Sequence, residues 1–406
     1  MRSHLWIAIA AWAAPAIAMA QPTTDPVPPP PPAPAPADQP APAPTPEPAP
    51  VKPAPDEEQM ARGQMRRLEG FTWEPFGYLR MEYEAVQNDP NVAYVGRNDG
   101  FEIQNARIGA RGRLGDRASF VLSFDGAIDE RSQINVPQGT LGFGMRDSYV
   151  DVVLQGKVVV RGGYWQCWLD PQAQVADTAR AFIDMPIESR GVRATEGYQT
   201  PPLPPGRSMG VGLRLDPGPQ RDGTAFGFEL AAQNGSDEFS SQNDNDTLAL
   251  SAAGIVRLPR GGWIVVAGRW NPRTVGMLPF RQDETDLQAS AGAGITAGLL
   301  ALEAGGIVQE TTFDTTGGPT QDAYGAHAQA MITIPASLPL AVGYRFGVLD
   351  PSSLITTDQV MEHTAGVVLG VPSLRMRLQF QLVHVVEQPG RELTNDRAQI
   401  GAEVAL

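Results

Sequence analysis

The sequence contains very little cysteine or histidine. Its single cysteine, Cys167, cannot form a disulfide bond within the chain, so disulfide bonds do not hold the fold together. The four histidines are scattered without metal-ligand spacing, and no phosphate-binding glycine loop, nucleophile elbow or zinc motif is present. These absences predict a protein that is not an enzyme and holds no metal or other cofactor. The formal net charge of −14 argues against a nucleic-acid partner.

Long apolar runs are also missing beyond the first 20 residues. Arg2, the apolar stretch 5–17 and the small residues around Ala20 are typical of a secretory signal peptide over residues 1–20, cleaved before Gln21. No later run of 18 apolar residues exists, which excludes a transmembrane helix after the signal peptide. The chain is therefore predicted to be exported.

From residue 71 to residue 406, apolar and polar residues alternate with a period of two. In the clearest case, Leu374, Met376 and Leu378 alternate with Arg375 and Arg377, so that one face is apolar and the other hydrated. Most such segments span about 9–13 residues, the length with which a tilted strand crosses a bilayer. They begin near residues 76, 101, 117, 144, 157, 207, 224, 247, 262, 286, 299, 323, 339, 359, 373 and 396. The predicted fold class is all-β: a transmembrane antiparallel β-barrel of about sixteen strands.

The connections between these segments alternate between short and long. The short ones are 114–116, 154–156, 259–261, 297–298, 335–339 and 370–372, and the long ones include 87–100, 129–142, 235–246, 271–283, 311–321 and 350–357. This sorting is typical of a bacterial outer-membrane barrel, with short turns in the periplasm and long loops outside. An even number of strands also places both ends of the barrel in the periplasm.

The carboxyl terminus ends in mid-strand without a polar tail. Gln399, Gly401, Val404 and Leu406 follow the pattern that the barrel-assembly machinery reads when it inserts a barrel into the outer membrane. A soluble protein seldom ends this way, because an unpaired apolar edge invites aggregation. In a barrel the last strand pairs with the first. A terminal strand of a soluble β protein is the alternative.

Residues 21–70 form a separate segment of different composition. Residues 21–55 contain 17 of the 38 prolines, interleaved with alanine, which predicts an extended spacer. Residues 56–70 have acids early and arginines late, as a short helix favours. We expect a periplasmic tether. A plain linker and a spacer that contacts peptidoglycan or helps subunits to associate both remain open.

If the apolar residues face lipid, the polar residues of the strands line the lumen. Twelve are basic and eight are acidic, so a modest preference for anions is expected. The alternative is that these charges pair across neighbouring strands and stiffen the wall. The basic residues are Arg107, Arg111, Arg113, Arg161, Arg269, Arg345, Arg375 and Arg377, with Arg80, Arg214, Arg257 and Arg397. The acidic residues are Glu82, Asp125, Asp147, Asp151, Glu229, Glu303, Glu362 and Glu403.

The third long connection, residues 164–206, is far longer than the others. Loops of this length are usually functional or disordered. We expect it to fold inward and narrow the lumen, and an outward lid is the alternative. Its charged candidates for a constriction have mixed signs, which predicts weak selectivity or a transverse field. They are Arg180, Asp184, Glu188, Arg190 and Arg193.

Four segments resemble the phosphate-selective porin O and P family. They are GFEIQNARIGARGRLGDRASFVLSFDGA (100–127), RDSYVDVVL (146–154), RSMGVGLRL (207–215) and FELAAQNGS (228–236). The resemblance implies a sixteen-stranded, homotrimeric outer-membrane porin with an inward third loop and basic residues that guide anions. Family members that select phosphate use several lysines, whereas this chain has only Lys52 and Lys157. Phosphate selectivity is therefore not carried over.

Two functions from different classes follow from these features. The first is a passive channel in the outer membrane, surrounded by lipid, through which small and possibly anionic solutes diffuse. The second is a structural barrel with little transport, anchored toward the cell wall by the proline-rich tether. Channel recordings distinguish the two.

Overall fold

The structure is a computed structural model that describes residues 70–97, 99–127, 142–175, 177–218, 223–235, 243, 245–276, 279–314 and 318–406. The chain divides into two units, Met1–Glu58 and Gln59–Leu406, and the first lies outside the described residues. The predicted signal peptide (1–20) and tether (21–70) therefore lie outside the described residues, apart from Gly70.

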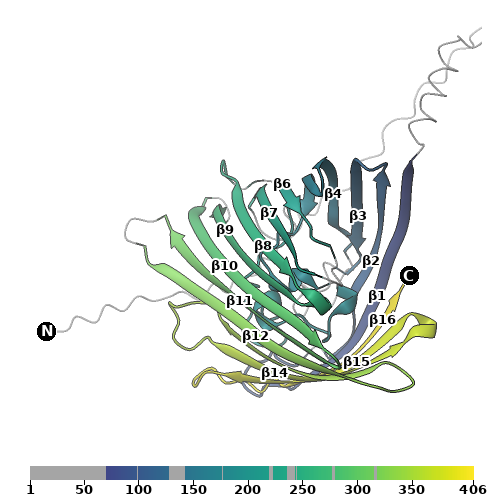
Figure 1. The fold of residues 1–406 in the computed structure, drawn as a ribbon. Coiled ribbons are helices and arrows are strands. Elements are labelled where there is room, and N and C mark those ends of the chain that lie inside the picture. Colours follow the sequence, from purple (N-terminus) through teal and green to yellow (C-terminus); the bar gives the residue numbers. More distant parts are fainter. Residues whose placement is uncertain are drawn as a thin grey trace, which may run out of the picture. The chain divides into compact units, whose positions relative to one another are not determined.

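Sixteen antiparallel strands in the described part of the chain form one closed barrel (Figure 1). Each strand pairs with its neighbours in the sequence, and β1 pairs with β16 to close the circle. The predicted fold class is confirmed. The strands are β1 (Phe71–Val86), β2 (Gly100–Leu114), β3 (Ala118–Asp125), β4 (Gly144–Gln155), β5 (Val158–Trp165), β6 (Ser208–Leu215), β7 (Ala225–Gln233), β8 (Ala249–Arg257), β9 (Trp263–Val275), β10 (Gln282–Ala297), β11 (Leu300–Phe313), β12 (Thr320–Ile334), β13 (Leu340–Asp350), β14 (Val360–Val371), β15 (Met376–Glu387) and β16 (Arg397–Ala405).

The two faces of the wall differ as the alternation requires. On β15, Leu378, Phe380 and Leu382 are exposed on the outside, while Gln379 and Gln381 between them are buried toward the lumen. The outer surface is apolar and the inner surface polar, as in a barrel whose outer face contacts lipid. Among the described residues, no helix is long and apolar enough to cross a membrane.

The closing pair of strands contains the carboxyl-terminal pattern. Gln399 and Gly401 are buried on the inner face of β16, whereas Val404 is exposed on the outer face. The backbone N–H of Leu406 donates to the carbonyl of Gly77 at 3.0 Å. The last residue is therefore still paired with β1.

Two sets of expected strand boundaries were wrong. β15 begins at Met376 and not near residue 373, because the 3-10 turn η5 (Pro372–Leu374) intervenes and Arg375 has a left-handed φ of 49°. Arg375 thus lies in a turn and not on a strand of the pore wall. The expected loops 271–283 and 311–321 are also too long, because β9 to β12 extend further. Those strand ends carry polar residues on both faces, so the alternation disappears there.

Candidate functional site

The long connection between β5 and β6 packs against the inner face of the barrel. It contains two short 3-10 turns, η2 (Pro171–Gln174) and η3 (Asp177–Ala179), and one helical turn, α2 (Ile187–Arg190). Two apolar clusters join it to the wall. One contains Ile187, Val192 and Leu203 of the connection with Ile307, Ala323 and Leu349 of the strands. The other joins Trp168 to Ile255, Trp263 and Val265. We call residues 164–206 the inner loop.

Polar wall residues satisfy the backbone of the inner loop. The Oε1 of Gln381 accepts a hydrogen bond from the N–H of Ile183 at 2.9 Å, and Arg345 donates to the carbonyl of Asp184 at 2.8 Å. Buried backbone groups require such partners, because water cannot reach them. Further donors from the wall are Gln288 to Leu203 O (2.7 Å), Gln379 to Ala181 O (3.1 Å), Arg377 to Arg180 O (2.6 Å) and Ser290 to Leu169 O (2.5 Å).

Glycines on the inner face give the loop room to approach the strands. At Gly325 an added Cβ atom would overlap the Cβ of Glu188, and at Gly292 it would lie 2.6 Å from the Cβ of Pro171. Four more strands provide the same space. The positions are Gly305 against Pro171, Gly347 against Ile187, Gly366 against Phe182 and Gly401 against Ile183. Glycine allows the close approach of the loop at these positions, most clearly at Gly325 and Gly292.

A network of ion pairs holds the far end of the inner loop. Arg190 donates to Glu196 and to Glu362 of β14, at 2.6 Å each. Arg397 of β16 also donates to Glu362, at 2.7 Å, and to Glu196, at 3.2 Å. All four side chains are less than one-tenth exposed. Burial acts to raise the pKa of Glu196, but Arg190 and the neighbouring guanidiniums lower that pKa below its usual range.

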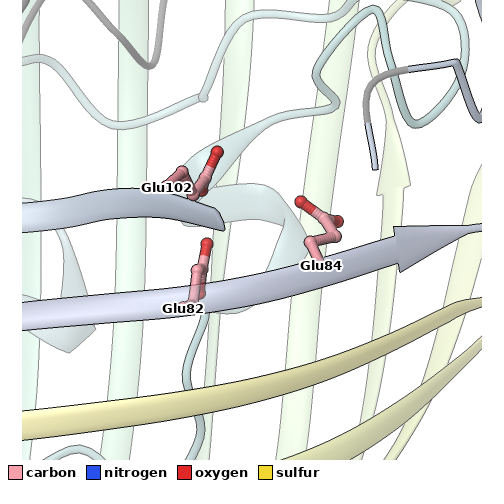
Figure 2. A group of neighbouring side chains, drawn as sticks. All are labelled: Glu82, Glu84 and Glu102. Carbon is pink, nitrogen blue, oxygen red and sulfur yellow. The ribbon is translucent and has the colours of Figure 1, made fainter. Parts of the chain in front are cut away.

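Arg193 connects the inner loop to a cluster of three carboxylates on β1 and β2. Figure 2 shows Glu82 and Glu84 on β1 and Glu102 on β2. One carboxylate oxygen of each lies within 4.8 Å of the others. Arg193 donates to Glu84 at 2.7 Å and to Glu102 at 2.8 Å. Its guanidinium thus supplies positive charge that such a cluster requires. Glu84 and Glu102 therefore help to fix the loop through Arg193, whereas Glu82 accepts a hydrogen bond from Gln104 of β2 at 3.1 Å.

A buried carboxyl, Asp170, lies at the start of η2. Its Oδ1 accepts from the backbone N–H of Gln172 at 2.9 Å and from the hydroxyl of Ser189 at 3.0 Å. Burial, the largest cause, raises the pKa of Asp170 to about 6. The two hydrogen bonds act to lower this pKa, and the nearby Glu188 acts to raise it. The group therefore titrates near neutral pH inside the folded loop.

Most of the predicted pore-lining arginines have polar partners on the inner face. Arg161 forms two hydrogen bonds of 2.8 Å with Asp151, and Arg107 pairs with Asp147. The other partners are Glu403 for Arg377, Glu74 for Arg111, Gln288 for Arg269 and the loop carbonyl for Arg345. Arg113 lies beside Arg111 toward the short turns of the barrel. Pairing across strands is thus common among these side chains.

The five charged residues predicted on the inner loop occupy different places. Asp184 accepts from Gln399 of β16 at 2.9 Å, and Glu188 pairs with His327 of β12. Arg190 and Arg193 belong to the ion-pair network, and Arg180 lines a cavity toward the short turns of the barrel. The structure therefore does not gather the five into one ring. Cys167, on the same loop, is buried, and burial raises the pKa of its thiol.

Two cavities adjoin the inner loop. The larger, about 680 Å³, lies toward the long loops and is lined by the loop segment 198–206 and polar strand ends, among them Arg273, Gln309 and Gln321. The smaller, about 310 Å³, lies toward the short turns and is lined by Arg180, Asp184, Glu303, Arg345 and Arg377 among others. The inner loop therefore lies between two water-accessible spaces.

The sequence did not single out several residues that fix the loop. Glu84, Glu102 and Glu196 became visible only once the path of the loop was known. A signal for the glycine track was present, because Gly292, Gly305, Gly325, Gly347, Gly366 and Gly401 all fall on the polar side of the alternation. Glycine at such positions in successive strands indicates close approach of another backbone segment.

Comparison with known proteins gives likeness in structure alone. No family model matches the sequence, and no curated protein matches it. An anion-selective porin from Comamonas acidovorans superposes with a TM-score of 0.58 at 16% identity, covering 83% of this chain and 100% of that chain. The outer-membrane channel DcaP of Acinetobacter baumannii gives 0.57 at 13%, covering 83% and 98%. OmpT of Vibrio cholerae, in its trimer form, gives 0.55 at 11%, covering 83% and 100%. At these identities the likeness establishes the barrel fold.

Proposed function

We propose that the protein is a bacterial outer-membrane porin, a passive channel for small polar solutes that the inner loop narrows. The observation that carries this proposal is the closed sixteen-strand barrel with an apolar outer face, a polar inner face and a cavity on each side of the loop. A barrel of this width is too wide for its own side chains to fill, so its lumen holds water. Its surroundings would be outer-membrane lipid, and its insertion would use the barrel-assembly machinery.

A modest preference for anions is part of the proposal. The cavity near the short turns is lined by Arg180, Arg345 and Arg377 against the two acids Asp184 and Glu303. A surplus of positive charge in a narrow aqueous passage attracts anions and repels cations. The preference is modest because Arg377 itself pairs with Glu403, and other wall arginines such as Arg107 and Arg161 face carboxylates that offset their charge. One structurally similar protein is described as an anion-selective porin.

We further propose that the protein acts as a homotrimer within the wider porin group. A trimer form is described for one structurally similar protein, OmpT. The apolar outer face is suitable both for lipid and for neighbouring copies. Membership of the phosphate-selective porin O and P family is proposed from the four resembling segments only. The proline-rich segment 21–70 is proposed as a periplasmic tether.

Recording from single proteins in a planar bilayer tests the channel. The purified, refolded protein should produce stable conductance steps, and its reversal potential in a KCl gradient should show a modest preference for chloride. A strong preference for cations would contradict the proposed anion preference but not the proposed channel. A barrel that is folded and inserted but electrically silent would contradict the channel and support the structural anchor.

A further inference from the structure

We infer that the outer wall of the barrel carries a binding site for a divalent transition-metal ion, formed by His363 of β14 and His384 of β15. The two residues lie directly opposite each other in the register of these neighbouring strands. Their ring centroids are 6.1 Å apart and the ring planes are inclined by 30°. Imidazole is a common ligand of Zn²⁺, Cu²⁺ and Ni²⁺, so a pair of facing rings has the chemistry of such a site.

Both rings lie on the outer face of the barrel. His384 alternates with the buried Val383 and Val385, and 63% of its side-chain surface is exposed. His363 lies between the buried Glu362 and Thr364, which face the lumen. The site is thus separate from the lumen and the inner loop. Both residues lie three positions from the strand ends that adjoin the long loops, at Val360 and Glu387, so an ion could reach them there without passing through the channel.

Each ring has one nitrogen engaged by a neighbouring oxygen. The Nδ1 of His384 lies 2.9 Å from an oxygen of Asp396, and an ionised carboxylate can only accept, so this nitrogen carries the proton. The Nε2 of the neutral ring is then left with a free electron pair. The Nδ1 of His363 lies 2.6 Å from the hydroxyl oxygen of Tyr344, which leaves its Nε2 available when that oxygen accepts. Metal-binding histidines typically have this arrangement, with the second nitrogen held by a carboxylate or another oxygen.

The order of the strands directs the free nitrogens toward each other. Tyr344 belongs to β13 and Asp396 immediately precedes β16, so the hydrogen-bonded nitrogens lie on the two outer flanks of the pair. The second nitrogen of each ring therefore faces the gap between β14 and β15. With metal–nitrogen distances of about 2.0–2.1 Å, two rings around one ion have centroids about 6.4 Å apart if the two bonds are collinear and about 5.2 Å apart if they are tetrahedral. The observed 6.1 Å lies between these values, so the rings must approach by about 1 Å to hold a tetrahedral ion, and water would complete the coordination.

The test uses the untagged, refolded full-length mature chain in detergent at pH 7.5. Titration with Zn²⁺ by calorimetry should give one site, and electron paramagnetic resonance of the Cu²⁺ form should show two coordinated nitrogens. His363→Gln or His384→Gln should each remove the two-nitrogen spectrum. Asp396→Asn should keep two nitrogens but weaken Zn²⁺ binding by about 10–100-fold, because the carboxylate orients the ring.

A matched control is His327→Gln, which changes the buried histidine on the inner face of β12. This variant should bind Zn²⁺ as the wild type does. Because His363 and His384 are on the outer surface, their variants should retain the closed barrel. Resistance to unfolding in cold detergent verifies that the barrel of each variant is folded. If the His363→Gln/His384→Gln double variant bound Zn²⁺ as tightly as the wild type does, the binding would be adventitious and the inference would be overturned. A Cu²⁺ spectrum of the wild-type protein with only one coordinated nitrogen would overturn it as well.

Discussion

Gly325 of β12 lies directly against Glu188 of the inner loop, so closely that no Cβ atom fits between the two backbones. Next to this contact on the same strand, His327 pairs with Glu188. Steric fit and pairing thus fix the loop at one point on the wall. Glycines on β10, β11, β13, β14 and β16 make similar close contacts, so the position of the loop depends on several strands of the wall.

Replacing Gly325 by alanine tests this fit. The added methyl group must displace the backbone at Glu188, and overpacking of this kind costs about 1–3 kcal/mol of unfolding free energy. We expect a lower unfolding temperature in detergent and an altered single-channel conductance. Gly254→Ala is the matched control, because a Cβ there meets no atom within 4 Å. Equal effects of the two substitutions would contradict the proposed fit.

Replacing Arg193 by glutamine tests the ion-pair network. The substitution leaves Glu84, Glu102 and Glu196 without their shared guanidinium, and breaking a buried pair costs about 3–5 kcal/mol. We expect a loosened loop, seen as noisier and larger conductance steps and a lower unfolding temperature. The control is Arg111→Gln, whose pair with Glu74 is mostly exposed and contributes about 0–1 kcal/mol. A stable, unchanged channel in the Arg193 variant would refute the role assigned to this residue.

Replacing Arg107, Arg111 and Arg113 together by glutamine tests the anion preference. Three positive charges leave the inner face; Glu74 loses its partner, while Asp147 keeps Arg207. The reversal potential in a KCl gradient should therefore shift toward cations. Arg375→Gln, at a turn outside the wall, should shift it much less. If the triple variant keeps the wild-type reversal potential, these arginines serve only to stiffen the wall.

Asp170 predicts a dependence of stability on pH. Its pKa is raised to about 6 in the folded protein, against about 3.9 when unfolded, so the folded state binds this proton more tightly. This stabilisation is present below about pH 4 and is lost as the pH rises through about 6. The difference in unfolding free energy between Asp170→Asn and the wild type should therefore increase by about 3 kcal/mol, in favour of the variant, from pH 4 to pH 8. Thermal unfolding at both pH values measures it, with the exposed Asp322→Asn as control, and a gain that is the same at both would contradict the assignment.

The sequence was sufficient to predict the number of strands, their order and their two faces. Alternation carries this information because one face contacts apolar surroundings and the other water. It failed where that contrast ends. Arg273 of β9 was expected in a loop, yet it pairs with Glu284 and Asp286 of β10 at 2.6 Å and 2.9 Å. The strand continues there with polar residues on both faces, which alternation cannot detect.

The contacts of the inner loop were not predictable from the sequence. Arg190 and Glu362 are 172 positions apart, and nothing local indicates that they meet. Their contact depends on the path of a loop without regular structure. The expectation that the loop residues 180–193 act together was based on proximity in sequence. In the structure, Arg180 lines the smaller cavity, toward the short turns, whereas Arg193 pairs with glutamates of β1 and β2.

The conductance of a variant with a shortened inner loop tests the central claim most directly. Residues 177–200 would be replaced by a short glycine–serine linker, and the refolded variant compared with the wild type in the same bilayer and salt. We predict steady steps for both proteins and clearly larger steps for the variant, because the loop sets the width of the passage. Equal conductance from two folded, inserted barrels would contradict this account.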